Sequence, residues 1–382
     1  MIYFDNAATT KVSEDVIADI IESLRNDWAN PSSISEQGME VKRKIEYARK
    51  QIADYINAEP EEIIFTASGS EANNLAIKGF LDANPAYRTI LTTEIEHPSV
   101  YNTCMDLKKK GYGVDFVPVN NSGKIKYFDF SDFLSIDIIF FVTVMLANNE
   151  LGTIQSIKLL AEETHKHNGI IHTDATQAFG KIPIDVKDMD VDLMSVGLHK
   201  IGLPKGIGFL YKKKGILLSP VIHGGHQEMN MRAGTENIAY IIAAGKQVER
   251  MKKKEYQSRL VINYLYNKVF DTLISDYEFI YNGAISPYET LPNLLSLTFP
   301  GINAEALITL LDIKGVCVSA GSACCAGEKT PSRVLKAIGL TDEQAFSTVR
   351  ISIREDTTTE ECDEFVRILG ECLKELKIMD GE

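Results

Sequence analysis

The chain has 382 residues, of which 45% are hydrophobic and 24% are charged, and its formal net charge at pH 7 is -13. This balance is typical of a globular protein with a large buried core, and the length predicts two or three domains. The acidic surplus argues against direct binding of nucleic acid, because contacts with phosphates require surfaces rich in lysine and arginine.

No segment predicts membrane insertion or export. The apolar run at 136–147 is too short to cross a bilayer and contains Asp137, so we expect a buried strand there. The first ten residues lack the basic-then-apolar pattern of a signal peptide. The six cysteines form no CxxC pair of the kind that binds zinc. We therefore predict a protein of the reducing cytoplasm, with no membrane contact and no metal site.

Strand-like and helix-like segments alternate from about residue 60 to about residue 240. The expected strands are 62–66, 89–93, 138–144, 170–173, 192–196 and 207–211, and the expected helices are 71–80, 100–110 and 157–167. This alternation predicts an α/β fold with a mostly parallel sheet and helices on both of its faces. Ligands of such sheets bind at the carboxyl ends of the strands.

The pattern changes after about residue 245. A long charged helical stretch (243–275) precedes two expected strands (294–299 and 348–353) and a last helix (359–376). We interpret this part as a second, smaller α/β domain. The predicted division gives a large domain of residues 16–244 and a small domain of residues 1–15 and 245–382.

The stretch TASGSEANNLAIKG (66–79) could bind an anion. Gly69 and Ser70 form a turn directly after an expected strand, and Glu71 opens a helix. Free backbone N–H groups at a helix start, together with a hydroxyl, suit a phosphate. The same residues are also consistent with an ordinary helix N-cap.

Two further stretches place reactive side chains just after strands. Asp174 follows an apolar strand, with Gln177 one helical turn later, so its carboxylate could hold a protonated ring nitrogen or cap a helix. His199 and Lys200 follow another strand in a loop rich in glycine and proline. A lysine near an apolar site can act as a nucleophile or proton carrier, although most loop lysines are only surface charges.

Taken together, a phosphate cradle, an acid for a ring nitrogen and a loop lysine are what pyridoxal 5'-phosphate requires. The lysine binds the cofactor covalently, and the aspartate keeps the pyridine ring protonated so that it acts as an electron sink.

The sequence resembles the cysteine desulfurase family, which are fold-type I pyridoxal-phosphate enzymes of the class V aminotransferase group. The resemblance covers nearly the whole chain. It is carried by FDNAATT (4–10), NPSS (30–33), FTASGSEANNLAIKG (65–79), EHPSV (96–100), NNELGTIQ (148–155), HTDATQAFGKIPIDV (172–186), HKIGLPKGIGFLY (199–211), HGGHQE (223–228), RAGTEN (232–237), LPNLLSLTF (291–299), VSAGSACCAG (318–327), PSRVL (331–335) and VRISI (349–353). It implies a large domain with a mainly parallel seven-stranded sheet between helices, a smaller α/β C-terminal domain, and a homodimer.

The resemblance also implies roles for particular residues. Lys200 would carry the cofactor, Asp174 would bond its ring nitrogen and Gln177 would bond its ring hydroxyl oxygen. His97 would stack on the ring and help to move protons. Ser70 and His199 would hold the phosphate, together with Thr235 from a second subunit. Asn149 and Arg350 would bind the substrate carboxylate, a task that suits the planar fork of arginine. Some of these residues have purely structural alternatives: His97 as a cap before Pro98, Asn149 as a turn residue and Arg350 as a surface charge.

The cysteine of the GSAC motif is the family's nucleophile, and here it is Cys324. Its loop (about 318–332) is rich in small residues and long, which resembles the branch with a flexible catalytic loop and would let the thiol travel to an acceptor. Because a free thiol has a pKa of about 8.5, a proton acceptor is needed, and His97 or the cofactor-bound substrate could supply it. Cys325 could be inert, accept sulfur from Cys324 or trap its persulfide, whereas a disulfide between adjacent cysteines would be strained.

The implied reaction converts L-cysteine to L-alanine and leaves a persulfide on Cys324. The sulfur would pass to an acceptor protein, either a scaffold for iron–sulfur clusters or a tRNA-thiolation enzyme. The alternatives are another pyridoxal-phosphate reaction, such as a lyase, aminotransferase or selenocysteine lyase reaction, and a binding platform without catalysis. Four positions depart from the family pattern and put the affinity for the cofactor in doubt. They are Ser35, Gly197, Leu203 and His226. The short segment after the last helix also puts a scaffold partner in doubt.

Overall fold

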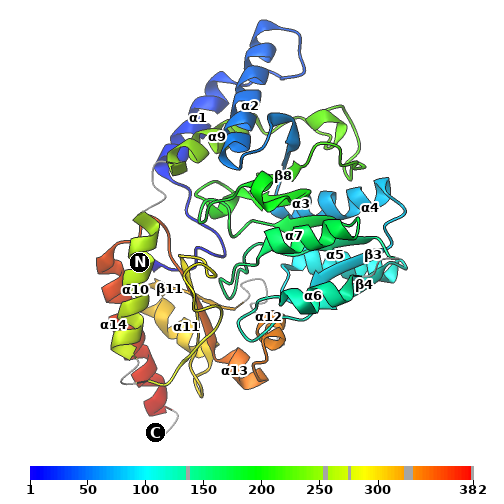
Figure 1. Ribbon diagram of the computed structural model, residues 1–382. Coiled ribbons are helices and arrows are strands. Elements are labelled where there is room, and N and C mark those ends of the chain that lie inside the picture. Colours follow the sequence, from blue (N-terminus) through cyan, green and yellow to red (C-terminus); the bar gives the residue numbers. More distant parts are fainter. Residues whose placement is uncertain (135–137, 253–256, 274–276, 322–329, 380–382) are drawn as a thin grey trace.

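A seven-stranded sheet forms the centre of the molecule in the computed structural model, which describes residues 1–134, 138–252, 257–273, 277–321 and 330–379 (Figure 1). Its strands, in spatial order, are β2 (Ile63–Thr66), β8 (Gly208–Lys212), β7 (Leu193–Gly197), β6 (Ile170–Asp174), β5 (Phe140–Thr143), β3 (Thr89–Thr93) and β4 (Gly113–Val117). Six of these strands run in the same direction, and β8 runs in the opposite direction. The predicted α/β class with a mainly parallel seven-stranded sheet is therefore confirmed.

Helices cover both faces of this sheet because successive strand residues point to opposite sides. One face packs against α3 (Gly69–Asn74), a π-helical turn (Leu75–Gly79), α4 (Phe80–Ala83) and α5 (Pro98–Lys109). The other face packs against α1 (Glu14–Asn26), α2 (Glu36–Tyr55), α6 (Tyr127–Phe133), α7 (Ile157–Lys166), α8 (Val186–Met189) and α9 (Ile238–Lys252). Ile63 and Ile64 show the alternation, since both are fully buried but pack on opposite faces of the sheet.

A second core forms around a four-stranded antiparallel sheet. Its spatial order is β12 (Ser319–Ala320), β13 (Thr348–Ser352), β10 (Leu294–Thr298) and β9 (Ile280–Tyr281). The helices of this part are α10 (Gln257–Leu273), α11 (Ala304–Ile313), α12 (Arg333–Ala337), α13 (Asp342–Phe346) and α14 (Thr359–Met379). In Figure 1, α10 and α14 lie side by side at the edge of the molecule.

The first residues of the chain belong to this second core. Strand β1 (Ile2–Tyr3) pairs in parallel with β11 (Val316–Cys317), and Phe4 packs against Phe365 of α14. This arrangement supports the predicted grouping of the N-terminal residues with the C-terminal part. The predicted boundaries fall inside helices α1 and α9, and the division itself stays a prediction.

Some predicted elements differ from the observed ones. The helix expected at 71–80 is α3, the π-helical turn and α4 in succession. Strand β4 was not expected, because it lies at the sheet edge and its exposed Asp115 interrupts the apolar pattern. The stretch 243–275 contains the end of α9 and all of α10, and its residues 253–256 and 274–275 lie outside the described residues. Of the helices that the structure describes, none has the length and apolar character needed to cross a membrane.

A buried ion pair joins α2 to the segment that follows β8. Both guanidinium Nη atoms of Arg49 contact the Glu228 carboxylate, at 2.7 and 2.9 Å, and Nη1 also donates to the Ile63 carbonyl. Residues 228–230 all have positive φ, at 46°, 56° and 66°. The ion pair therefore holds a left-handed backbone conformation that is unfavourable for residues other than glycine.

Substituting Glu228→Gln should destabilise the fold by about 3–5 kcal/mol, because the buried Arg49 charge loses its buried counter-ion and keeps only the exposed carboxylate of Glu46. The measurement is the free energy of unfolding in urea. The control is Glu40→Gln, whose partner Arg43 is exposed, and which should change stability by less than about 1 kcal/mol. Equal midpoints for the two variants would contradict the expectation.

Candidate active site

The predicted site residues gather at the carboxyl edge of the central sheet. Asp174 is the last residue of β6, and His97 caps the N-terminus of α5, four residues after β3. Lys200 ends a short 3-10 turn directly after β7. Because β3, β6 and β7 are parallel, their carboxyl ends lie at the same edge and bring the three side chains to one region.

A chain of hydrogen bonds connects Asp174 to His97. The amide Nδ2 of Asn73, on α3, donates to Asp174 Oδ2 at 2.7 Å and to Ser99 Oγ at 2.8 Å. Ser99 Oγ in turn lies 2.8 Å from His97 Nδ1. Neither Asn73 nor Ser99 was among the site residues predicted from the sequence, so this series of hydrogen bonds was not expected.

Burial lowers the pKa of His97, and the charges of Lys200 and Arg333 lower it further, whereas the Asp174 carboxylate raises it. The imidazole is therefore predominantly neutral near pH 7. Asp174 and Lys200 are therefore close enough to His97 for their charges to influence its protonation.

The segment FDNAATT passes over Lys200. The Nζ atom of Lys200 donates to the carbonyl oxygens of Ala7 and Ala8, at 2.5 Å each. Gln177 Nε2 donates to the same Ala7 carbonyl at 2.8 Å, and Lys181 Nζ donates to Gln177 Oε1 at 2.8 Å. Gln177 and Lys200 therefore share one backbone acceptor, which places both beside the N-terminal segment.

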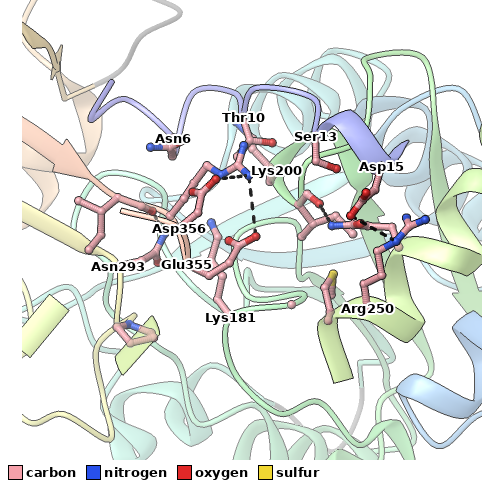
Figure 2. Close-up of a pocket in the computed structure, with 17 residues that line it drawn as sticks. Asn6, Thr10, Ser13, Asp15, Lys181, Lys200, Arg250, Asn293, Glu355 and Asp356 are labelled. Atoms are coloured by element: carbon pink, nitrogen blue, oxygen red, sulfur yellow. Dashed lines mark hydrogen bonds and ion pairs between the residues drawn. The ribbon is translucent and has the colours of Figure 1, made fainter. Parts of the chain in front are cut away.

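A cavity of about 140 Å³ lies next to Lys200 (Figure 2). Its polar lining mixes positive and negative charges, with Lys181 and Arg250 on one hand and Asp15, Glu355 and Asp356 on the other. Asp174 and His97 do not line this cavity. Lys200 lines it, so the cavity contains only one of these three predicted site residues.

Lys181 is an unpredicted amine beside Lys200. Burial lowers its pKa to about 7, and the charges of Lys200 and Arg350 contribute to the shift. Below that pH the folded chain must hold a desolvated ammonium group, whereas above it the amine is neutral. The unfolded chain keeps this lysine protonated up to the ordinary pKa of 10.5. Stability therefore rises with pH between about 7 and 10.5.

We expect the gain in stability from Lys181→Met, measured against the natural chain, to be largest at pH 6. The gain should shrink as the pH rises from about 7 to 10.5, because the natural chain itself becomes more stable over this range. Thermal unfolding at a series of pH values measures it. Lys158→Met is the control, because the pKa of that exposed lysine is raised by its hydrogen bond to Asp188. It should give no gain at pH 6. A pH-independent effect of Lys181→Met would contradict the expectation.

The start of α3 makes a close approach to the end of β7. A Cβ atom on Gly69 would lie 3.0 Å from Thr176 Oγ1 and 3.1 Å from the Gly197 nitrogen, so a larger residue here would push against the end of β7. Thr176 Oγ1 accepts a hydrogen bond from that nitrogen at 3.0 Å, and Ser70 is exposed at the helix start. Exposed N–H groups, a hydroxyl and a nearby threonine fit a phosphate group.

His199 also lies at this end of the site. Its Nδ1 is 3.2 Å from Thr9 Oγ1, and burial together with neighbouring lysines lowers its pKa to about 4. A neutral imidazole can still donate a hydrogen bond to phosphate. Thr235 is exposed in the loop before α9, so it is accessible to another molecule.

The departures from the family pattern have physical explanations in this fold. A side chain at Gly197 would crowd Thr176, since its Cβ would lie 3.2 Å from Thr176 Cγ2. Ser35 caps α2 by accepting from the Gly38 nitrogen, and Leu203 is buried in the core. His226 contacts Asn230 at 2.6 Å. Thr176 therefore supplies a hydroxyl beside Gly197.

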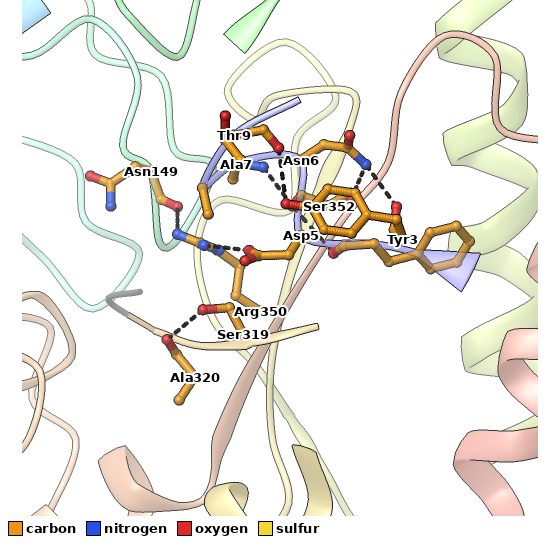
Figure 3. A network of polar contacts seen from close by, with 12 residues as sticks. Tyr3, Asp5, Asn6, Ala7, Thr9, Asn149, Ser319, Ala320, Arg350 and Ser352 are labelled. Carbon is orange, nitrogen blue, oxygen red and sulfur yellow. Dashed lines mark hydrogen bonds and ion pairs between the residues drawn. The ribbon is translucent and has the colours of Figure 1, made fainter. Parts of the chain in front are cut away.

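Arg350 is buried in β13 and is not a surface charge (Figure 3). Its Nη2 contacts Asp5 Oδ1 at 2.7 Å, and its Nη1 donates to the backbone carbonyl of Asn149 at 2.9 Å. Its Nε has no hydrogen-bond partner in the described ranges. Arg350 and Asn149 are thus brought together, although through the Asn149 backbone and not its amide.

Cys324 and Cys325 lie in 322–329, outside the described residues, and so does most of the loop expected at 318–332. The flanks of this segment are described. Ser319 pairs with Arg350 in the sheet, Ser332 Oγ donates to the buried Glu150 carboxylate, and Arg333 donates to the Glu96 carbonyl. The N-terminal flank is therefore paired with the strand that carries Arg350, and the C-terminal flank is anchored to residues adjacent in sequence to His97 and Asn149.

The other four cysteines are poor nucleophiles. Cys104, Cys362 and Cys372 are buried, and burial raises their pKa to about 12, 12 and 11. The pKa of Cys317 is also raised by burial. None of these thiols ionises readily near pH 7. Within the described part of the chain, no cluster of three or more histidine, cysteine or carboxylate side chains could hold a metal ion.

Comparison with known proteins places the chain in a family. The model of the family described as aminotransferase class-V matches residues 2–365. The putative cysteine desulfurase IscS 1 of Bacillus subtilis (strain 168) is 40% identical over 383 residues, which cover 98% of this chain and 99% of that protein.

Solved structures agree. A NifS-like protein superposes with a TM-score of 0.91 at 33% identity, covering 98% of this chain and all of that chain. The structure described as SspA in complex with cysteine has a TM-score of 0.81 at 35% identity, covering 94% of this chain and all of that chain. The chain therefore belongs to the aminotransferase class-V family and, within it, to the cysteine desulfurases.

Proposed function

We propose that the protein converts L-cysteine to L-alanine with pyridoxal 5'-phosphate and retains the sulfur as a persulfide on Cys324. The observation that carries the proposal is the meeting of Asp174, His97 and Lys200 at one edge of the sheet, where the C-terminal flank of the Cys324 segment is also anchored. The similar structure of SspA in complex with cysteine supports the choice of substrate.

The residues present fit the cofactor. Lys200 would bind it covalently, Asp174 would hold its ring nitrogen protonated, and Gln177 would contact its ring oxygen. The phosphate would be held at the start of α3 by Ser70, by Thr176 and His199, and by Thr235 of the partner subunit. When bound, the cofactor supplies an electron sink that stabilises negative charge on the substrate Cα.

The substrate carboxylate would bind Arg350, whose guanidinium fork matches it. In the structure one edge of that fork contacts Asp5, so the substrate would take the place of Asp5 there. Asn149 would help to position the carboxylate. The amine of Lys200 would accept the Cα proton, because it already lies at the centre of the site beside the Ala7 and Ala8 carbonyls.

Cys324 would then attack the substrate sulfur as a thiolate. A sulfur–sulfur bond forms, and the carbon–sulfur bond breaks with its electron pair remaining on carbon. Protonation of that carbon gives alanine, and the persulfide stays on Cys324. The raised pKa values of the four described cysteines support this choice of nucleophile, since they leave only Cys324 and Cys325 as candidates.

The working unit would be a homodimer, since Thr235 would act across the subunit interface. The persulfide would pass to an acceptor protein in the cytoplasm, either an iron–sulfur scaffold or a tRNA-thiolation enzyme. Neither nucleic acid nor a membrane would be contacted directly, in keeping with the net charge of -13.

The products formed from L-cysteine by the purified holoenzyme test this proposal. We expect alanine, with sulfur retained by the protein until a reductant is added and then released as sulfide. Pyruvate and ammonia would show β-elimination instead, and a requirement for a keto acid would show transamination. Protein that shows no visible absorbance with added cofactor would indicate a binding platform. Each of these three results would overturn the proposal.

A further inference from the structure

The geometry points to Ser99 and Asn73 as positioning residues that fix His97 in the tautomer with its proton on Nε2. The starting observation is that two groups lie against the same ring nitrogen. The backbone nitrogen of Ser99 is 3.1 Å from His97 Nδ1, and the Ser99 hydroxyl is 2.8 Å from it. A backbone N–H can only donate, so Nδ1 must be the acceptor.

The direction of the remaining bonds follows from this assignment. With Nδ1 accepting, the Ser99 hydroxyl also donates to it and keeps its lone pairs for the amide of Asn73. The same Asn73 amide donates its other proton to Asp174. A flipped Asn73 amide would set its oxygen against the Asp174 carboxylate, and two acceptors repel each other. All four bonds therefore agree on one arrangement, with donors directed from Asn73 and Ser99 towards Asp174 and His97.

The surroundings keep the ring in its neutral form. The charged groups that act electrostatically on His97 are Asp174 at the end of β6, Lys200 after β7 and Arg333 on α12. Burial and the two cations together outweigh the carboxylate, so that the pKa of His97 is lowered. Each hydrogen bond donated to Nδ1 stabilises the unprotonated nitrogen and acts in the same direction.

The consequence, which rests on the proposed function, concerns the fate of the Cys324 proton. In this tautomer the free face of His97 presents a hydrogen-bond donor, Nε2–H, while the basic nitrogen is occupied by Ser99. His97 would therefore orient and hydrogen-bond groups in the site, and the thiol proton would pass to another acceptor. Asn73 and Ser99 act through His97 and are positioning residues, not catalytic ones.

The tautomer can be observed directly by NMR of protein labelled with nitrogen-15 histidine and prepared without cofactor, so that the result does not depend on any reaction. His97→Gln identifies the resonances of His97. In the natural chain near neutral pH we expect Nδ1 to be unprotonated and Nε2 to carry the proton.

Ser99→Ala should raise the pKa of His97 by about 0.5–1 unit, a three- to tenfold rise in proton affinity, because it removes one of two donors to Nδ1. Asn73→Ala should give a smaller rise, and Ser99→Thr, which keeps the hydroxyl, should restore the natural value. In the holoenzyme, the acidic limb of the pH profile of kcat/KM should move upward with Ser99→Ala by the same amount.

Thr103→Val is the matched control. Thr103 lies one turn further along α5, and its hydroxyl donates to the Ser99 carbonyl but does not touch His97. It should leave the tautomer and the pKa of His97 unchanged. A proton on Nδ1 in the natural chain would overturn the inference, as would a Ser99→Ala variant with the natural pKa. If the NMR result holds while L-cysteine gives no alanine, the proposed function fails and the tautomer assignment stands.

Discussion

Alanine formation and covalent cofactor binding should both be lost when Lys200 is replaced by alanine. The proposed roles of Lys200 combine the covalent linkage with acceptance of the Cα proton, and proton transfer by a positioned side chain alone contributes about 10²–10⁴-fold to a rate. We therefore expect at least a 10⁴-fold fall in kcat/KM, on the order of the upper end of that range. The measurements are alanine production and the visible absorbance that remains with the protein after gel filtration.

The matched control is Lys205→Ala, because Lys205 is an exposed lysine in the same loop. It should retain bound cofactor and most of its activity. If Lys200→Ala kept a covalently attached cofactor and formed alanine at the natural rate, another residue would have to carry the cofactor. Lys181 would then be the first alternative to test, because it also lines the cavity beside Lys200.

Cys324→Ser should separate cofactor binding from sulfur transfer. We expect the variant to keep its visible absorbance and to lose alanine formation by at least about 10³-fold, since removing the nucleophile of an enzyme commonly costs that much or more. A serine hydroxyl is a far weaker nucleophile towards sulfur and cannot hold a persulfide. The measurements are alanine production and the mass of the protein after exposure to L-cysteine.

Cys325→Ser is the control for this variant and also resolves the role of the second cysteine. If Cys325 is inert, its variant should form alanine and carry bound sulfur as the natural chain does. If it accepts sulfur from Cys324, the variant should form alanine but deliver less sulfur to an acceptor. Natural turnover by Cys324→Ser would show that Cys324 is not the nucleophile.

The sequence predicts much of the catalytic edge because parallel strands align their carboxyl ends. Asp174 and Lys200 each follow an apolar run that can be recognised without a structure, and the fold then brings them together. The antiparallel direction of β8 is not predictable in this way. A buried strand has the same apolar pattern in both directions, and only its pairing with β7 and β2 reveals the orientation.

The positioning residues could not be identified from the sequence because their role depends on contacts between distant segments. Asn73 meets Asp174 across 101 positions of the chain, and no motif in either stretch indicates this pairing. Lys181 looks like a surface lysine after a turn until the fold places it beside Gln177 and Lys200. Likewise, the pairing of Arg350 with Asp5 joins the two ends of the chain.

That pairing gives the short N-terminal segment a part in communication between substrate and lysine. Asp5 contacts Arg350 (Figure 3), and the carbonyl oxygens of Ala7 and Ala8, two and three residues later, accept hydrogen bonds from the amine of Lys200. Neighbours so close on one backbone cannot shift independently. An incoming amino acid that displaces Asp5 from Arg350 should therefore also weaken the hydrogen bonds between Lys200 and the two carbonyl oxygens. Binding of the substrate carboxylate would in this way free the amine that must react with the other end of the substrate.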